Sequence, residues 1–430
     1  MDVLINYGTI LVIISAVFGF FMAVGIGAND VANSMGISVG TKVLTVKQAI
    51  LIAIVFEFAG AYFAGGEVTS TIRKGVIETS SFVHQPDILV YGMMSALLAA
   101  GTWLLLASYM GWPVSTTHSI IGAIIGFACT SVGTHIVDWV SVQRIVASWV
   151  ITPAISGLIA YAIFISAQKL IFNTANPLVN AKRLIPVYMF LTVMVLFFIT
   201  VKKGLKHINL HLSNSEAFFW SVGVSAVVML IGYINIQKKY PNQKSEENSD
   251  ENESKGGYSD LERVFASLIV VTACAMAFAH GSNDVANAIG PLSAIVATVE
   301  NIGEITTQSR IAWWALPLGG LGIVVGLAVL GFRVIATVGT GITELTPSRG
   351  FAAELATACT VVLASGTGLP ISTTQTLVGA VLGVGFARGI AALNLRVVRN
   401  IVASWIVTLP AGGLLSVAFF YIIKNIMLGI

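Results

Sequence analysis

Long runs of apolar residues alternate with short polar ones along most of the chain. A helix needs about 20 mostly apolar residues to cross a bilayer. On that rule the pattern predicts an all-α polytopic membrane protein with about twelve hydrophobic segments. They centre on residues 4–24, 47–66, 88–110, 114–130, 145–166, 185–201, 217–236, 263–281, 311–332, 351–366, 371–387 and 400–423.

Two of these segments, 114–130 and 371–387, are short and rich in glycine, and each follows a Gly-x-Pro sequence. Interrupted helices are tolerated at membrane depth where they are buried in protein or line a cavity. We therefore expect broken or re-entrant helices there rather than simple crossings.

Three sequence blocks recur in the two halves of the chain, in the same order and at nearly the same spacing. GANDVANSMG at 27–36 matches GSNDVANAIG at 281–290, PVSTT at 113–117 matches PISTT at 370–374, and IVASW occurs at 145–149 and 401–405. This indicates an internal duplication. If every segment is counted as a crossing, seven crossings separate equivalent points. Seven is an odd number, so the second repeat should be inverted, a common transporter plan with the site between the repeats.

One long polar stretch, residues 237–262, divides the halves and holds almost no apolar residues. Such a stretch cannot bury a core, so we expect a flexible loop. The predicted organisation is a first transmembrane repeat at 1–166, connecting transmembrane segments at 167–236, this loop, and a second repeat at 263–430.

Composition supports a membrane protein, since 56% of residues are apolar and only 10% are charged, against roughly 25% in soluble proteins. A net charge of +3 without a basic cluster gives no reason to expect nucleic acid. Lys and Arg accumulate on the cytoplasmic side of membrane proteins. Their distribution favours both termini outside and the central loop in the cytoplasm, although Lys202, Lys203 and Lys206 oppose this.

The repeated Asn-Asp motif is the strongest candidate for cation chemistry. On a helix Asn29 and Asn33 share a face with Asp30 beside them, and carboxylate and amide oxygens are hard ligands that suit sodium. The flanking glycines should let the helix break and free backbone carbonyls. The alternative is that the asparagines bond between helices and the Asp is paired, but two matched copies favour an ion path.

The Pro-x-Ser-Thr-Thr blocks suggest an anion site. Proline favours the first helical turn, where free N–H groups and the positive end of the helix dipole attract anions. Alternatively, the hydroxyls bond back to helix carbonyls or pack between helices. The residues concerned are Ser115, Thr116 and Thr117 with Ser372, Thr373 and Thr374.

Several other polar residues stand in apolar surroundings. Glu57 and Glu354 are each compatible with a functional role or with reaching solvent near a span end. His118 and His280 adjoin the motifs and are candidate proton carriers or structural residues. Gln375 stands where the first repeat has His118, which argues against a symmetric proton relay.

At these motifs the chain resembles the inorganic phosphate transporter (PiT) family of sodium- or proton-coupled symporters. The resemblance covers both repeats. It rests on Gly27–Asn33, Phe278–Pro291, both Pro-x-Ser-Thr-Thr blocks, Thr71–Gly75 and Thr346–Phe351. It implies a duplicated carrier that imports inorganic phosphate, functional roles for the motif Asn and Asp residues and for Glu57 and Glu354, and a homodimer.

Taken together, the sequence predicts a sodium-driven phosphate symporter of the cell (inner) membrane that works by alternating access. Sodium is preferred because the motif pairs Asn with Asp rather than a carboxylate with histidine. The predicted phosphate ligands are Asn33, Ser115, Thr116, Thr117, Asn287, Ser372, Thr373 and Thr374. The predicted sodium ligands are Asn29, Asp30, Asn283, Asp284, Glu57 and Glu354, with His118, His280 and Gln375 as auxiliary residues.

Other functions remain open at this stage. Within transport they are proton-coupled uptake of phosphate or a metal–phosphate complex, and sulfate transport; outside it they are a passive anion channel and an intramembrane enzyme that uses Asp30 and Asp284. We expect no organic cofactor. The chain has no Gly-x-x-x-x-Gly-Lys-Ser/Thr sequence, so a nucleotide-driven pump is not expected.

Overall fold

The computed structural model describes residues 2–203, 212–240, 260–301, 311–332, 334–335, 345–389 and 395–429. Among these residues, regular structure is entirely helical apart from one isolated bridge between Ile77 and Val137. Most of the predicted flexible loop at 237–262 lies outside the described residues. The prediction of an all-helical fold is confirmed.

Each of the twelve predicted hydrophobic segments corresponds to a helix. They are α1 (Asp2–Gly40), α2 (Val46–Ala64), α4 (Pro86–Tyr109), α5 (Thr116–Ser131), α6 (Trp139–Ala167), α7 (Pro177–Lys203), α8 (Asn214–Lys239), α9 (Asp260–Glu300), α10 (Ala315–Val329), α12 (Pro347–Gly366), α13 (Thr373–Arg388) and α14 (Leu395–Leu428). A short helix, α3 (Gly66–Lys74), follows α2. Eight of the described helices are long and apolar enough to cross a membrane.

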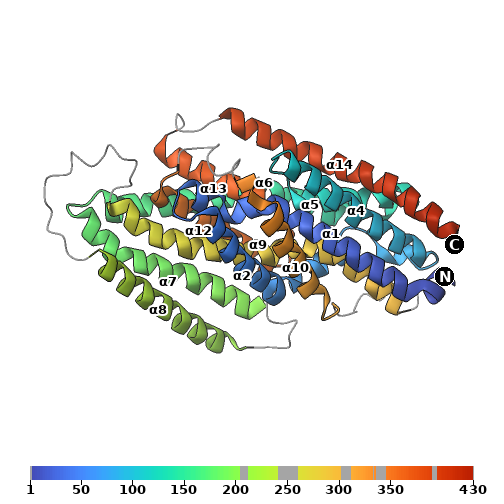
Figure 1. The fold of residues 1–430 in the computed structure, drawn as a ribbon, viewed down its shortest axis with the longest axis horizontal. Coiled ribbons are helices and arrows are strands. Elements are labelled where there is room, and N and C mark those ends of the chain that lie inside the picture. Colours follow the sequence, from blue (N-terminus) through green and yellow to red (C-terminus); the bar gives the residue numbers. More distant parts are fainter. Residues whose placement is uncertain are drawn as a thin grey trace.

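The two longest helices, α1 and α9, carry the two Asn-Asp motifs and run antiparallel. Gly8 near the start of α1 lies against Val299 near the end of α9, and Gly19 lies against Leu292. Both chain termini lie at one end of the elongated bundle, and the end of α8 and the start of α9 lie at the opposite end (Figure 1). This is the arrangement expected of inverted repeats.

Each repeat contains a helical hairpin whose turn lies inside the bundle, α4–α5 in the first repeat and α12–α13 in the second. The turns use Gly111 with φ 69° and Gly368 with φ 74°, a left-handed conformation that glycine adopts without steric cost. Ser115 and Ser372 then cap the second helix of each hairpin. The Pro-x-Ser-Thr-Thr blocks therefore lie at internal helix N-termini, as predicted.

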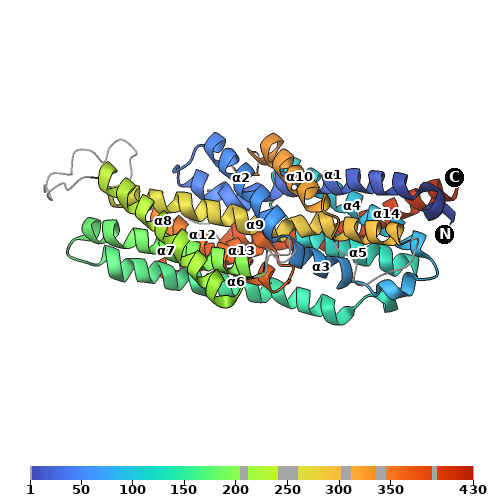
Figure 2. The same cartoon turned by 90° about the horizontal axis from the view of Figure 1, so that it is seen from below.

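The repeats interlock through these hairpins. Helix α5 of the first repeat packs against α14 of the second, and α13 of the second packs against α6 of the first (Figure 2). Gly122 lies against the backbone of Leu409, and Gly379 lies against the backbone of Pro153. Small residues allow such close helix contact in membranes. Each hairpin is thus held by the last helix of the other repeat.

The expected break of the helix at the Asn-Asp motif is wrong. Both α1 and α9 continue through their motifs without interruption. The flanking glycines serve close packing instead: a Cβ on Gly27 would overlap the backbone of Ile323 in α10, and one on Gly281 would overlap that of Glu57 in α2. Because the helical hydrogen bonds persist, the carbonyls there remain engaged within the helix.

We predict that G27A lowers thermal stability, because the added methyl group meets backbone that cannot move aside. Overpacking of this kind costs about 1–3 kcal/mol. The matched control is G223A in α8, where an added Cβ meets nothing within 4 Å. Melting temperatures in detergent should fall for G27A and stay level or rise for G223A. Equal shifts would contradict the packing role.

Candidate functional site

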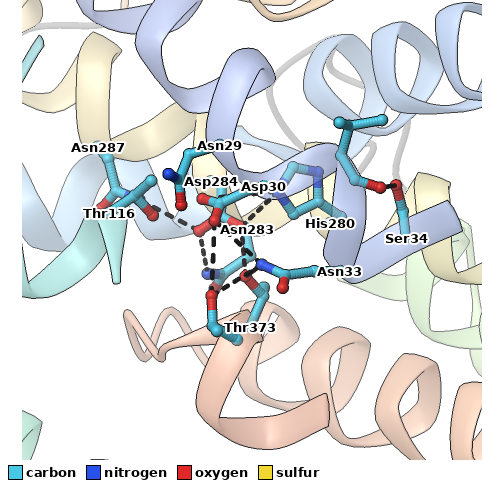
Figure 3. Close-up of polar contacts among 12 residues, drawn as sticks. Asn29, Asp30, Asn33, Ser34, Thr116, His280, Asn283, Asp284, Asn287 and Thr373 are labelled. Carbon is cyan, nitrogen blue, oxygen red and sulfur yellow. Dashed lines mark hydrogen bonds and ion pairs between the residues drawn. The ribbon is translucent and has the colours of Figure 1, made fainter. Parts of the chain in front are cut away.

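The two Asn-Asp motifs meet where α1 and α9 cross in the centre of the bundle. Asp30 is 1% exposed and Asp284 is fully buried. His280, one turn before Asp284 on α9, lies beside the two aspartates, and its Nε2 faces both of them (Figure 3). A carboxylate oxygen from each aspartate and a ring nitrogen of His280 lie within 4.8 Å of one another. This cluster brings two carboxylates and a histidine together inside the bundle.

His280 links three carboxylates. Its Nε2 lies 3.0 Å from Asp284 Oδ2 and 3.9 Å from Asp30 Oδ2, while its Nδ1 lies 3.3 Å from Glu57 Oε2. Glu57, on α2, also accepts a 2.6 Å hydrogen bond from Ser34 Oγ. The auxiliary residue predicted beside the motif therefore lies at its centre, and it joins Glu57 to the aspartates.

The first asparagine of each motif holds the hairpin of its own repeat. Asn29 donates from Nδ2 to Ser108 Oγ at 3.2 Å and to the carbonyl of Trp112 at 3.0 Å, and its Oδ1 accepts from the N–H of Val114. Asn283 likewise donates to the carbonyl of Ile371 at 3.0 Å.

Asn283 Oδ1 also accepts a 3.4 Å hydrogen bond from Ser365 Oγ. Ser108 and Ser365 are equivalent residues of the two repeats. Both asparagines therefore hold the hairpin turn of their own repeat against the motif helix, but the direction of the serine–asparagine hydrogen bond is reversed between the repeats.

The second asparagine of each motif reaches the hairpin of the other repeat. Asn33 Nδ2 donates to Thr374 Oγ1 at 2.8 Å. Asn287 Nδ2 lies 3.3 Å from Thr116 Oγ1 and 3.4 Å from Thr117 Oγ1. The same nitrogens donate to the aspartate of their own motif, at 3.0 Å to Asp30 and 3.1 Å to Asp284. The site is thus assembled from both repeats by a two-fold pattern of contacts.

The threonines supply hydroxyl groups directly to this cluster. Thr373 Oγ1 donates to Asp284 Oδ2 at 2.9 Å, and Thr374 Oγ1 lies 3.5 Å from Asp30 Oδ1. Ser115 and Ser372, predicted with them, instead use their side chains to accept from the N–H groups of His118 and Gln375. Thr373 and Thr374 thus face the aspartates, Thr117 Oγ1 donates to the carbonyl of Ile371 at 2.9 Å, and the two serine side chains cap the helices.

Glu354 lies apart from the central cluster. It is fully buried and accepts 2.6 Å hydrogen bonds from Ser38 on α1 and Thr272 on α9. Ser38 is two helical turns beyond Asp30. Glu354 therefore forms a separate oxygen cluster, and the two predicted glutamates do not share one site.

His118 and Gln375 also lie outside the hydrogen bonds of the central cluster. The His118 ring lies 3.7 Å from the ring of Trp149 on α6, and its Nδ1 lies 3.3 Å from the carbonyl of Trp405 on α14. These contacts tie the start of α5 to the last helix of each repeat.

The sequence interpretation missed five serine and threonine partners of the acidic and amide groups. Ser34 and Ser38 lie on α1, one and two turns beyond Asp30, and Thr272 lies two turns before His280 on α9. Their helical spacing from the motif gives a signal that places them on the same face. Ser108 and Ser365 are a further repeat-related pair that a wider comparison of the halves would have found.

The site can hold both a cation and an anion. Carboxylate oxygens from Asp30 and Asp284 converge, and two buried oxygens, Asp30 Oδ2 and Asn287 Oδ1, have no hydrogen-bond donor in the described structure. Such oxygens suit a hard cation. Two internal helix N-termini, each with a pair of threonine hydroxyls, suit an oxyanion. The carboxylates and these donors are in direct contact with each other.

Comparison with known proteins places this architecture in context. The profile of the phosphate transporter family matches residues 26–416. A putative phosphate permease of Haemophilus influenzae is 60% identical over 99% of this chain and all of its own length. An Arabidopsis thaliana protein named inorganic phosphate transporter 2-1, chloroplastic, is 41% identical over 99% of this chain and 73% of its own length.

One solved structure is also similar, described as the sodium-dependent phosphate transporter. It is 42% identical, with a TM-score of 0.88, and the alignment covers 97% of this chain and 99% of that one. The likeness therefore extends over the whole bundle, including both motif helices and both hairpins.

We predict that H280A is less stable than the wild type, because three buried carboxylates lose their shared partner. Removing one member of a buried ion pair costs about 3–5 kcal/mol. Sodium should raise the melting temperature of H280A more than that of the wild type, since a bound cation would replace His280 as the partner of the buried carboxylates. H84A, which alters an exposed histidine, is the control. An equal sodium shift in H280A and the wild type would contradict a cation site at these carboxylates.

Proposed function

This chain belongs to the phosphate transporter family, and we propose that it imports inorganic phosphate by symport with sodium ions. The observation that carries this proposal is the pair of buried aspartates facing two internal helix N-termini. The transported anion and its driving cation would then bind in contact with each other. The sodium dependence named for the similar solved structure supports the choice of cation.

The coupling follows from electrostatics. Inorganic phosphate carries between about one and two negative charges near pH 7. Burying it beside Asp30 and Asp284 without positive charge would cost many kcal/mol. Of the described ion pairs, those of these aspartates are all with His280. Bound sodium would neutralise the remaining charge, so each solute would favour binding of the other.

The proposed ligands follow the contacts in the structure. Phosphate would bind to the threonine hydroxyls, the first N–H groups of α5 and α13, and the amide nitrogens of Asn33 and Asn287. Sodium would bind to oxygens of Asp30 and Asp284. In the structure, hydroxyls and amides of these groups donate to the aspartates. The proposed phosphate and sodium ligands therefore already belong to one hydrogen-bond network.

Four of the predicted sodium ligands have other roles in this scheme. Asn29 and Asn283 use their amides mainly to hold the hairpins, so we assign them to positioning the site. Glu354 with Ser38 and Thr272 would provide a second cation position. Glu57 would influence the sodium position at Asp30 and Asp284 indirectly, through its contact with His280.

Alternating access would use the two repeats as moving parts. Each hairpin turn contacts the motif helices of both repeats. Opening the site to one side of the membrane would therefore break the contacts of a hairpin with one motif helix and keep its contacts with the other. This is the usual logic of inverted repeats around a midplane site. We further propose a homodimer in the cell membrane with both termini outside.

A second coupling mode is favoured by one observation. Glu57, His280 and Asp284 form a continuous carboxylate–histidine–carboxylate chain, the kind of arrangement that carries protons within membranes. The sequence argument for sodium assumed that no such chain exists, and that assumption is wrong. Proton-coupled uptake is therefore the competing function.

We predict that purified protein in proteoliposomes takes up radiolabelled phosphate against its concentration gradient when a sodium gradient is imposed. The coupling argument requires that an inward sodium gradient alone drives accumulation. A proton gradient imposed at equal sodium tests the competing mode. Uptake that follows protons and ignores sodium would overturn sodium coupling, and uptake that never exceeds equilibrium would indicate a passive channel.

We predict that D30N and D284N each raise the sodium concentration needed for half-maximal uptake by about tenfold or more, since each removes a carboxylate ligand from the cation position. The affinity of both variants for phosphate at low sodium should also fall. D87N, at the first turn of α4, removes a carboxylate outside the site and is the control. Unchanged dependence on both solutes in D30N and D284N would overturn the coupling mechanism.

A further inference from the structure

A narrow fissure lies beside the central site at the junction of five helices, α2, α3, α7, α9 and α12. Its polar lining comes from Glu67 on α3, Thr200 on α7, Ser282 on α9 and Ser365 on α12. The free volume is about 10 Å³, close to the least that one water needs. Helix α7 belongs to the connecting segments, so this fissure is not made by the repeats alone.

Two residues of the fissure lining adjoin the second Asn-Asp motif. Ser365 Oγ donates to Asn283 Oδ1 at 3.4 Å, and Ser282 directly precedes Asn283 in α9. Asn283 in turn donates to Asp284 Oδ1 at 3.0 Å. A solute at this part of the fissure is therefore one side chain away from the proposed cation position.

Size and charge both select against phosphate in this fissure. Phosphate is a tetrahedral group of five heavy atoms and is far larger than one water, whereas a sodium ion that has shed most of its hydration shell is smaller than a water molecule. The charged residue of the lining is Glu67, and a carboxylate attracts a cation and repels an anion. Hydroxyl groups along the lining replace part of the lost hydration.

The equivalent region of the first repeat is built differently. Ser108, the counterpart of Ser365, accepts a hydrogen bond from Asn29, and the same Asn29 amide also bonds to the carbonyl of Trp112. Ser365 instead donates to its asparagine. The two serines thus offer a matched comparison between a position on the fissure and one away from it.

We propose that this fissure is the route by which the coupling cation reaches Asn283 and Asp284, separate from the wider opening that phosphate requires. This inference rests on the proposed sodium coupling. It assigns Glu67 as a residue that attracts the cation and Ser365 as the last hydroxyl on the route. It also gives the connecting helix α7 a direct part in transport.

The test measures initial rates of phosphate uptake into proteoliposomes against sodium at saturating phosphate, and against phosphate at saturating sodium. E67Q should raise the half-saturating sodium concentration by roughly threefold or more and leave the half-saturating phosphate concentration unchanged. E78Q removes the same charge from an exposed position and should change neither. T200F, which narrows the fissure, should slow uptake at low sodium and recover at high sodium.

S365A and S108A separate the route from simple positioning of the asparagines. If both variants raise the half-saturating sodium concentration equally, the cause is loss of the serine–asparagine hydrogen bond. If S365A raises it more than S108A, the difference supports the proposed cation route. If the wild type depends on sodium but E67Q and T200F keep the wild-type sodium dependence, the route is overturned while coupling stands. A change confined to phosphate dependence in E67Q also overturns it. If wild-type uptake ignores sodium, the coupling and the route fall together.

Discussion

The burial of two aspartates at one helix crossing is the constraint on which the rest of this structure depends. A carboxylate in a low-dielectric interior needs hydrogen-bond donors or positive charge close by. Asp30 and Asp284 obtain them from His280, from their own motif asparagines and from threonines of the two hairpins. The hairpins can supply these donors only because glycine turns allow helix N-termini to lie inside the bundle. The interlocked packing of α5 with α14 and α13 with α6 then keeps them there.

Much of the fold could be predicted from the sequence because it depends on local sequence patterns, which can be recognised without knowing which residues contact each other. Long apolar runs define the helices, and repeated blocks define the duplication. The inverted sense of the repeats followed from counting crossings, and the antiparallel contacts of α1 and α9 agree with it. The helix break at the motif was predicted wrongly because glycine has two uses. It can weaken a helix, or it can let another backbone approach, and only the position of Ile323 beside Gly27 decides between them.

The sequence predicted which residues form the candidate site, but not which of them contact each other. Matched copies identified the asparagines, aspartates and threonines, yet the exchange by which Asn33 meets Thr374 and Asn287 meets Thr116 depends on how the hairpins cross. Residues without a repeat counterpart were harder to place. His280 aligns with Ile26 of the first repeat, so symmetry gives no guide to its position between three carboxylates. Glu57 and Glu354 look alike in sequence, but they lie in different clusters.

The exchange of contacts between repeats has an evolutionary consequence. Asn33 and Asn287 each complete their hydrogen bonds on a hairpin encoded in the opposite half of the chain. A half-length ancestor could have built this site only by pairing with a second copy of itself inserted upside down in the same membrane. Gene fusion would then have fixed the two orientations in one polypeptide. Each half would then be free to diverge, and the pair of Ile26 and His280 is one equivalent position at which the two halves differ.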